Sequence, residues 1–108
     1  MVMRMDEAMQ PFSLGIWQIK PGKENEFVEL FRNFAEWVLK RNLGAIEVYL
    51  LQDIVQPGRF ISSGPWDSIQ KIDDWRKLPE FREFFAKAKG LSVDVVPLTM
   101  KPVIHIKR

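Results

Sequence analysis

The segment Gly58–Ala88, GRFISSGPWDSIQKIDDWRKLPEFREFFAKA, decides the fold of this chain. Its first residues predict a strand that runs into Trp66, and the next residues predict a helix that carries Trp75. A second short helix is expected to begin at Pro79, because the missing amide N–H of proline costs nothing in the first helical turn. We expect the two indoles to line an apolar pocket for a small organic molecule, beside an inward stripe of core residues, Phe81, Phe84 and Phe85.

The elements around this segment follow from the spacing of apolar residues. Within Lys23–Arg41, apolar residues recur at the interval that places an apolar stripe along one side of a helix. Strands are expected over Phe12–Lys20, Ala45–Ile54 and Val93–Lys107, each bounded by turn residues. Two prolines in the last of these strands predict an edge position or a bulge.

The resulting order of elements is β-α-β-β-α-β, with the helical part after the third strand divided at Pro79. This order predicts an α+β, ferredoxin-like fold with one antiparallel sheet and helices on one of its faces. A chain of 108 residues has the length of a single domain. We assign residues 12–108 to that domain and residues 1–11 to a flexible leader.

Both faces of the expected sheet carry apolar side chains, although helices can cover only one of them. In the first strand Leu14 and Ile16 alternate with Trp17, and in the second strand Leu50 alternates with Tyr49. Soluble monomers rarely expose an apolar patch of that size. Packing the uncovered face against a second copy removes it from water, at roughly 25 cal/mol per Å² of apolar area. We therefore predict a twofold homodimer, a dimeric α/β barrel, with Trp17 and Tyr49 at its interface. The alternative for these two residues is that they line the pocket.

The composition argues against several classes of protein. Sixteen Lys and Arg residues are spread among fourteen Asp and Glu residues, without the basic stripe that is typical of nucleic-acid binding. The third strand, Arg59–Trp66, also lacks the second aromatic platform of an RNA-recognition motif, which has the same order of elements. No apolar run is long enough to cross a bilayer, and the first ten residues do not resemble a signal peptide. We expect a cytoplasmic protein with no nucleic-acid and no membrane partner.

Metal chemistry has few candidate ligands in this sequence. The chain contains no cysteine, which excludes disulfides, thiolate metal sites and thiol nucleophiles, and it contains one histidine. A metal site would need carboxylates, but Asp73 and Asp74 are adjacent on a helix and diverge by about 100°. We therefore expect no bound metal.

Three stretches carry a resemblance to a known family: IKPGKENEFVELF at 19–31, LLQDIVQPGRFISSGPWDS at 50–68 and WRKLPEFREF at 75–84. They resemble the antibiotic biosynthesis monooxygenase-like family of the dimeric α/β-barrel superfamily. The resemblance covers about residues 12–107 and depends on structural signatures, namely a proline-glycine turn before a long helix and a Trp, helix, break, Phe pattern. Members of that family include cofactor-independent oxygenases of phenolic or quinol substrates, haem-degrading oxygenases and many proteins without a known activity.

The haem-degrading branch can be compared residue by residue. Its enzymes use an Asn on the first strand, a Trp on the helix after the third strand, and a His that ligates the iron. When aligned on WRKLPEF, the Trp corresponds to Trp75, the His position falls on Phe85, and the Asn position falls near Gly15. Because a phenylalanine cannot ligate iron, haem degradation of that kind is not expected. Haem handling without degradation stays open as a third alternative.

The resemblance implies a cofactor-independent monooxygenase that acts on a small aromatic or quinol compound. In such enzymes the deprotonated substrate itself passes an electron to dioxygen, and the protein supplies an apolar cage with polar groups that orient the substrate and accept its proton. The candidate catalytic residues are His105, Asn33 and Tyr49, although none of them lies in a motif. The candidate pocket residues are Trp66, Trp75, Phe85, Phe31 and Arg76.

Each of these residues also has a simpler interpretation. A lone histidine on a strand is more often a surface or hydrogen-bonded residue than a general base, and buried tryptophans are more often pocket wall than catalytic groups. The alternative function is therefore a noncatalytic small-molecule binding or stress-associated module on the same fold. The absence of a committed base favours that alternative.

Overall fold

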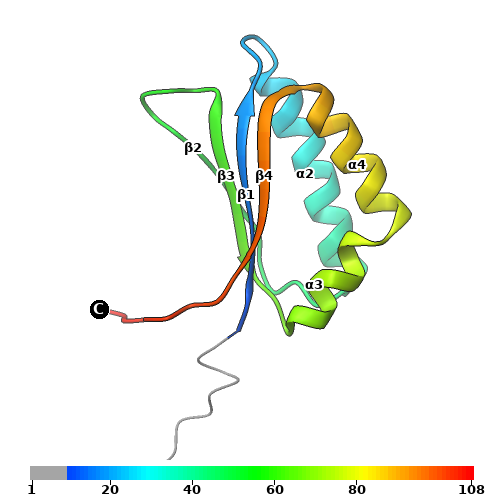
Figure 1. Cartoon of the computed structure of the whole chain (residues 1–108), viewed down its shortest axis with the longest axis vertical. Helices are drawn as coiled ribbons and strands as arrows, with labels where there is room; N and C mark the ends of the chain where they lie inside the picture. Colours follow the sequence, from blue (N-terminus) through cyan, green and yellow to red (C-terminus); the bar gives the residue numbers. More distant parts are fainter. Residues whose placement is uncertain (1–9) are drawn as a thin grey trace, which may run out of the picture.

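The computed structural model describes residues 10–108, so the expected leader lies outside these residues except for its last two positions. Within them the order of elements is β-α-β-β-α-α-β. The strands form one antiparallel sheet in the spatial order β2-β3-β1-β4, with the helices on one face (Figure 1). The strands are β1 (Phe12–Ile19), β2 (Tyr49–Gln52), β3 (Arg59–Pro65) and β4 (Ser92–Met100); the helices are α2 (Glu24–Lys40), α3 (Ile69–Arg76) and α4 (Pro79–Gly90). This arrangement confirms the predicted α+β, ferredoxin-like fold.

The last strand is shorter than predicted. β4 ends at Met100 instead of Lys107, and the residues that follow it belong to no strand. Met100 pairs with Phe12, the first residue of β1, so the residues after Met100 have no neighbouring strand among residues 10–108. The end of β4 is therefore determined by the start of β1.

The second strand is also shorter than the predicted Ala45–Ile54. Its ladder with β3 begins at the pair Tyr49 and Ser63, and Ala45 forms only an isolated bridge with Trp66. Three residues lie between Ala45 and Tyr49 but only two between Ser63 and Trp66, so one residue is left over and the ladder is interrupted. Gly64 lies at this interruption, where a Cβ atom would collide with a backbone carbonyl of the facing chain.

The helix-facing side of the sheet holds the core. Along β1 the odd-numbered residues point to this side, so Trp17 is only 4 % exposed and packs against Phe27 of α2, with ring centroids 5.0 Å apart. The prediction that Trp17 lies at a dimer interface is therefore wrong, because the helices cover its face of the strand. The buried residues form two clusters: Trp17, Ile19, Phe27, Phe60, Phe84 and Ala88 in one, and Val38, Trp66 and Ile72 in the other.

The opposite face of the sheet, the open face, is covered by no helix of the described chain (Figure 1). Strand pairing places Leu51, Ile61, Ile16 and Val96 side by side, so that an apolar row crosses all four strands, and each of these side chains is exposed. Tyr49 lies on the same face and is 54 % exposed. The β2–β3 connection and the C-terminal residues extend beyond the sheet on this side, away from the helices (Figure 1).

Candidate functional site

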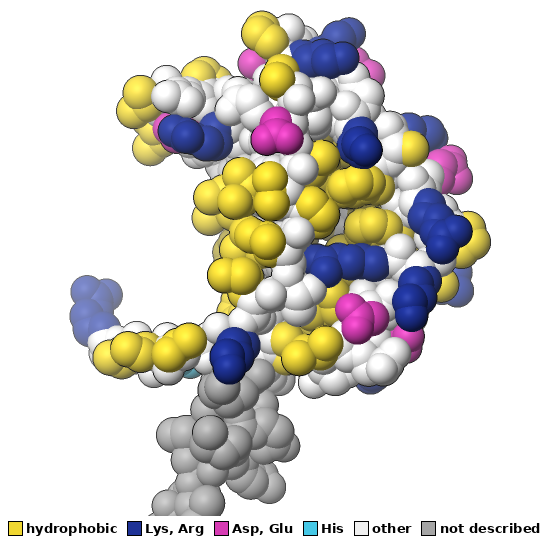
Figure 2. Space-filling view, viewed as in Figure 1, with side chains coloured by type: hydrophobic (Ala, Val, Ile, Leu, Met, Phe, Trp, Pro, Cys, Tyr) yellow, Lys and Arg dark blue, Asp and Glu magenta, His cyan; other side chains and the backbone are white. Residues whose placement is uncertain are grey.

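A cavity of about 60 Å³ lies between the helix-facing side of the sheet and the three helices. Its lining is predominantly apolar, and Figure 2 shows hydrophobic side chains in a hollow between the sheet and α4, with basic side chains at its margin. The lining residues come from α2, α3 and α4, from β1, β3 and β4, and from the segment just before β2. Because so many elements converge on it, the cavity is a property of the whole fold.

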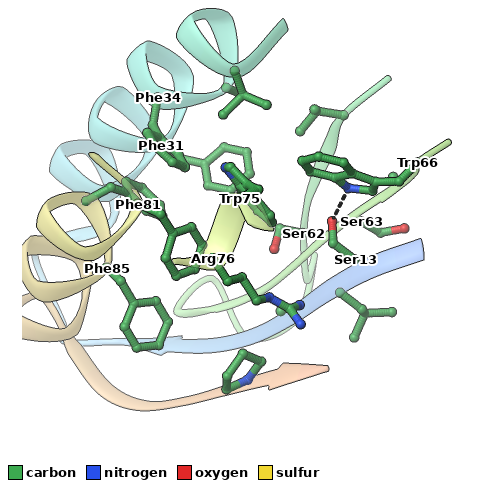
Figure 3. Close-up of a pocket in the computed structure, with 18 of the residues that line it drawn as sticks. Ser13, Phe31, Phe34, Ser62, Ser63, Trp66, Trp75, Arg76, Phe81 and Phe85 are labelled. Carbon is green, nitrogen blue, oxygen red and sulfur yellow. Dashed lines mark hydrogen bonds between the residues drawn. The ribbon is translucent and has the colours of Figure 1, made fainter. Parts of the chain in front are cut away.

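Aromatic rings form the wall of this cavity (Figure 3). Trp66 follows β3 and Trp75 lies on α3, and their ring centroids are 4.6 Å apart. Phe81 of α4 meets Trp75 edge to face at 4.7 Å, and Phe34 of α2 stacks beside the same indole at 6.1 Å. The break before Pro79 turns α4 back toward α3, which is why Phe81 reaches Trp75. Offset and edge-to-face pairs of this kind hold the wall in a defined shape.

Two serine hydroxyls are fixed at the sheet side of the cavity by indole N–H groups. Trp17 Nε1 donates a hydrogen bond to Ser62 Oγ at 3.0 Å, and Trp66 Nε1 donates to Ser13 Oγ at 2.9 Å (Figure 3 marks the second bond). Gly15 leaves the room for the first pair, because a Cβ at this position would lie 2.7 Å from both Ser62 Oγ and Trp17 Nε1. Since each hydroxyl accepts a hydrogen bond from an indole, its own proton remains for another acceptor.

Arg76 is the charged residue in the lining, and it reaches from α3 to the edge strand β4. Its Nη1 donates to Thr99 Oγ1 at 2.6 Å and its Nη2 donates to the Leu98 carbonyl at 2.7 Å. Burial lowers the pKa of the guanidinium, while the negative charge of Asp73 opposes that shift. Arg76 Nε and Trp75 Nε1 are both buried without a hydrogen-bond partner in residues 10–108. Two N–H donors that belong to lining residues are thus left without a partner by residues 10–108.

All five residues that the sequence predicts for the pocket line this cavity: Trp66, Trp75, Phe85, Phe31 and Arg76. Sequence reasoning missed the two serines and Gly15, which share one face of the sheet with Trp17 and Phe60. The alternation along β1 could have suggested Ser13, since it has the same parity as Trp17. Ser62 could be placed only once the register of β1 against β3 is known.

The three predicted catalytic residues do not line this cavity. Asn33 is exposed on α2 and borders a separate shallow groove, Tyr49 lies on the open face, and His105 is exposed after the end of β4. The structure therefore does not bring the three together. Their catalytic role stays a prediction.

Two further features concern what the described residues do not contain. Within residues 10–108 no group of three or more His, Cys, Asp or Glu side chains is arranged to hold a metal ion. None of the helices in this part of the chain is long and apolar enough to span a membrane.

The fold and the site define a ferredoxin-like α+β protein with an aromatic cavity between its sheet and its helices. A family model described as antibiotic biosynthesis monooxygenase matches residues 15–87, which is more than half of the chain. The chain therefore belongs to the antibiotic biosynthesis monooxygenase family, and the resemblance that the sequence suggested is confirmed. No curated protein matches the chain.

Solved structures with the same fold have little sequence identity to this chain. A mutant of SnoaB from Streptomyces nogalater, described as a cofactor-independent oxygenase, has a TM-score of 0.82 and 13 % identity, over 92 % of this chain and 98 % of that chain. A conserved protein from Methanosarcina mazei Go1 has a TM-score of 0.79 and 20 % identity, over 88 % and 94 %. A structure described as an antibiotic biosynthesis monooxygenase has a TM-score of 0.76 and 18 % identity, over 87 % and 99 %. At these identities the likeness establishes the fold alone.

Proposed function

We propose that this protein is a cofactor-independent monooxygenase that acts on a small aromatic or quinol compound. The observation that carries the proposal is the cavity, in which Trp66, Trp75 and Phe81 form an aromatic wall and fixed hydroxyls lie at the sheet. Membership in the monooxygenase family supports it. The description of SnoaB as a cofactor-independent oxygenase is consistent with it.

The chemistry needs no reductant besides the substrate. A quinol and one molecule of dioxygen give a hydroxyquinone and water: one oxygen atom enters the ring, the other leaves as water, and the substrate supplies all the electrons. The first electron passes from the deprotonated quinol to dioxygen. The protein then has to bind the ring, exclude water and stabilise negative charge on the substrate oxygen, which the aromatic wall and the N–H and O–H donors are suited to do.

The test is oxygen consumption with a panel of quinols, with the product from ¹⁸O₂ examined by mass spectrometry. We expect uptake above the rate of autoxidation and one labelled oxygen in the product. Ala35→Phe adds a ring at a residue that lines the cavity and should abolish most of the uptake, whereas Ala86→Phe adds the same ring at an exposed position of α4 and should not. Uptake that never exceeds the protein-free rate for any quinol would count against an oxygenase.

The second candidate is a noncatalytic module that binds a small aromatic molecule. One observation favours it: no Asp, Glu or His side chain lies among the described residues that line the cavity, so the site of one subunit offers no ordinary proton acceptor. Native mass spectrometry of the purified protein tests it. A bound aromatic compound that keeps its mass after exposure to air supports a binding module, and a compound that gains oxygen supports the enzyme.

We also propose that the protein acts as a homodimer in which two open faces pack together about a twofold axis. The exposed row of Leu51, Ile61, Ile16 and Val96 supports this, because a face of this kind is rarely left in water. The C-terminal residues add exposed Val103, Ile104 and Ile106 on the side that points away from the helices. Sedimentation equilibrium tests the proposal, and a single-subunit mass at micromolar concentration would reject it.

A further inference from the structure

Every polar side chain that lines the cavity carries a hydrogen-bond donor. The unused N–H groups are those of Trp75 and Arg76, and the two serine hydroxyls each have a proton to give after accepting from an indole. No carboxylate, imidazole or side-chain amide lies among the described residues of the lining. Ser63 also belongs to the lining, but its position in the strand pairing, opposite Tyr49, places its side chain toward the open face. A ligand that fits such a lining must offer acceptors.

Arg76 carries a positive charge without a counter-ion from the described chain. The ion pairs in residues 10–108 connect other residues, which are exposed or partly exposed at the surface. Asp73 lies close enough to influence the guanidinium but forms no ion pair with it. Partial burial of a charge is unfavourable unless the charge is paired or fully hydrogen-bonded, so this position is unexplained by the stability of the fold alone.

The hydrogen bonds of Arg76 fix its direction. Five N–H groups are available in a guanidinium, and one bond each to Thr99 and Leu98 ties the group to β4. Figure 3 shows the side chain running from α3 past Phe81 toward β1 and β4, so that the guanidinium lies at the sheet end of the cavity. The Nε–H remains without a partner. The group is therefore held in place by the protein while part of its donor capacity is kept free.

We propose that the cavity binds its ligand as an aromatic anion, with a carboxylate or an ionised ring oxygen held by Arg76. The ring lies against the indoles of Trp66 and Trp75, and the negatively charged oxygen supplies the counter-ion that residues 10–108 do not provide. The substrate class is an aromatic carboxylate or an acidic phenol, which carries its charge before it binds. The statement that the anion is a substrate depends on the proposed oxygenase function. The statement that the cavity binds an anion does not.

This inference also explains how an oxygenase of this kind works without a base in the cavity. A phenol that enters already ionised at its ring oxygen has no proton to give up before it passes an electron to dioxygen, whereas an ionised carboxylate serves only to hold the ring in place. Arg76 then stabilises the oxygen anion and lowers the pKa of a bound phenol, since an adjacent cation favours the charged form of an acid. Affinity should accordingly follow the ionisation of the ligand.

The experiment compares pairs of ligands that have one shape and differ in charge. Benzoate against benzamide, and 2-naphthoate against 2-naphthamide, are titrated calorimetrically into the full-length protein at neutral pH. A charged hydrogen bond predicts that each carboxylate binds about tenfold or more tightly than its amide. In Arg76→Gln this preference should disappear while the affinity for the amides stays within about twofold. Arg82→Gln, which removes the same charge from an exposed position of α4, should keep the wild-type preference.

Two results would overturn the inference: equal affinity of the wild-type protein for carboxylate and amide, or a preference that survives in Arg76→Gln. If Arg76→Gln does not fold by circular dichroism, the wild-type protein alone decides. A hydroxynaphthalene should then bind at least tenfold more tightly above its own pKa than below it, and pH-independent affinity contradicts the proposal. An anion preference without oxygen uptake supports anion binding and rejects the oxygenase function. Oxygen uptake without an anion preference supports the oxygenase function and rejects anion binding.

Discussion

Both faces of the sheet carry large apolar side chains, but their surroundings are opposite. On the helix-facing side, Trp17 and Phe60 are almost completely buried under α2 and α4. On the open face, their strand neighbours Ile16 and Ile61 are each 37 % exposed. Alternation along β1 and β3 produces both sets, and the helices cover only one of them.

The difference between the two faces indicates that a ligand binds on the helix-facing side and that a protein partner binds on the open face. The buried face combines its rings with fixed hydroxyls and one guanidinium, which are the features of a site that orients a small molecule. The open face carries the continuous apolar row of Leu51, Ile61, Ile16 and Val96, which is typical of a surface that meets another protein.

The largest effect is expected in the core of the helix-facing side. Phe27 is completely buried against Trp17 and Phe60, so Phe27→Ala should lower the free energy of unfolding by about 3–5 kcal/mol. Leu39→Ala on the same helix removes a partly exposed side chain and should cost no more than about 1 kcal/mol. Urea unfolding followed by circular dichroism measures both. Equal losses would mean that this face is not the main core.

A substitution on the open face should instead weaken the association of two subunits in the proposed dimer. Ile61→Asp places a charge in the middle of the apolar row, and we expect the dissociation constant of the dimer to rise at least about 100-fold, roughly 3 kcal/mol. Ile69→Asp makes the same change at an exposed position at the start of α3 and should leave the dimer intact. Sedimentation velocity of both variants gives the result. An unchanged dimer in Ile61→Asp would move the interface to another surface.

A smaller loss of stability is expected from a substitution at Gly15, where the backbone of β1 packs closely against Ser62 and Trp17. In Gly15→Ala the new methyl group would press against Ser62 Oγ and Trp17 Nε1, which should cost about 1–3 kcal/mol and displace the hydroxyl from the cavity. Gly90→Ala is the matched control, because a Cβ at that position meets nothing within 4 Å and its φ is not positive. We expect it to be neutral or slightly stabilising. Thermal unfolding and calorimetric binding of an aromatic ligand separate the two effects, and a neutral Gly15→Ala would show that the pair can shift freely.

The sequence alone was enough to predict the secondary-structure elements and the aromatic wall. It was not enough to predict the side-chain contacts that depend on the register between strands. The spacing of Trp66, Trp75 and Phe85 around the break at Pro79 could be read directly, because neighbouring turns of one short segment bring them together. The place of Ser62 beside Trp17 depends on how β3 aligns with β1, and no local pattern encodes that alignment.

The same limitation explains the errors at Trp17 and at the end of β4. Which face of β1 the helices cover is determined by the path of the chain between strands, so the sequence alone could not decide whether Trp17 is core or interface. The end of β4 depends on its partner: the apolar residues after Met100 continue the pattern of a strand, but β1 begins at Phe12 and has nothing to pair with them. In both cases the missing information lies in another segment of the chain.

The smallest expected effect concerns the β2–β3 connection, which extends on the open side and carries the almost fully exposed Ile54. The carboxylate of Asp53 stabilises this turn, because it accepts hydrogen bonds from the backbone N–H groups of Gln56 and Val55 and from Arg59 Nε. These bonds lower the pKa of Asp53, with the bond from Gln56 contributing most, then Val55 and then Arg59. A lowered pKa in the folded state means that the charged form stabilises the turn above the ordinary pKa of an aspartate, about 3.9, and that this stabilisation is lost as pH falls through the lowered value.

We therefore expect the amide resonances of the turn to move toward random-coil positions only in the acidic range below about pH 4, while the core resonances stay in place. Asp53→Asn retains one acceptor oxygen but loses the charge, so its turn should be looser at neutral pH and should lack the acid transition. Two-dimensional ¹⁵N NMR across pH measures both proteins. If the exposed tip of this turn contacts a second copy, the acid transition should also weaken the dimer; a transition that leaves the dimer unchanged would restrict the interface to the strands of the open face.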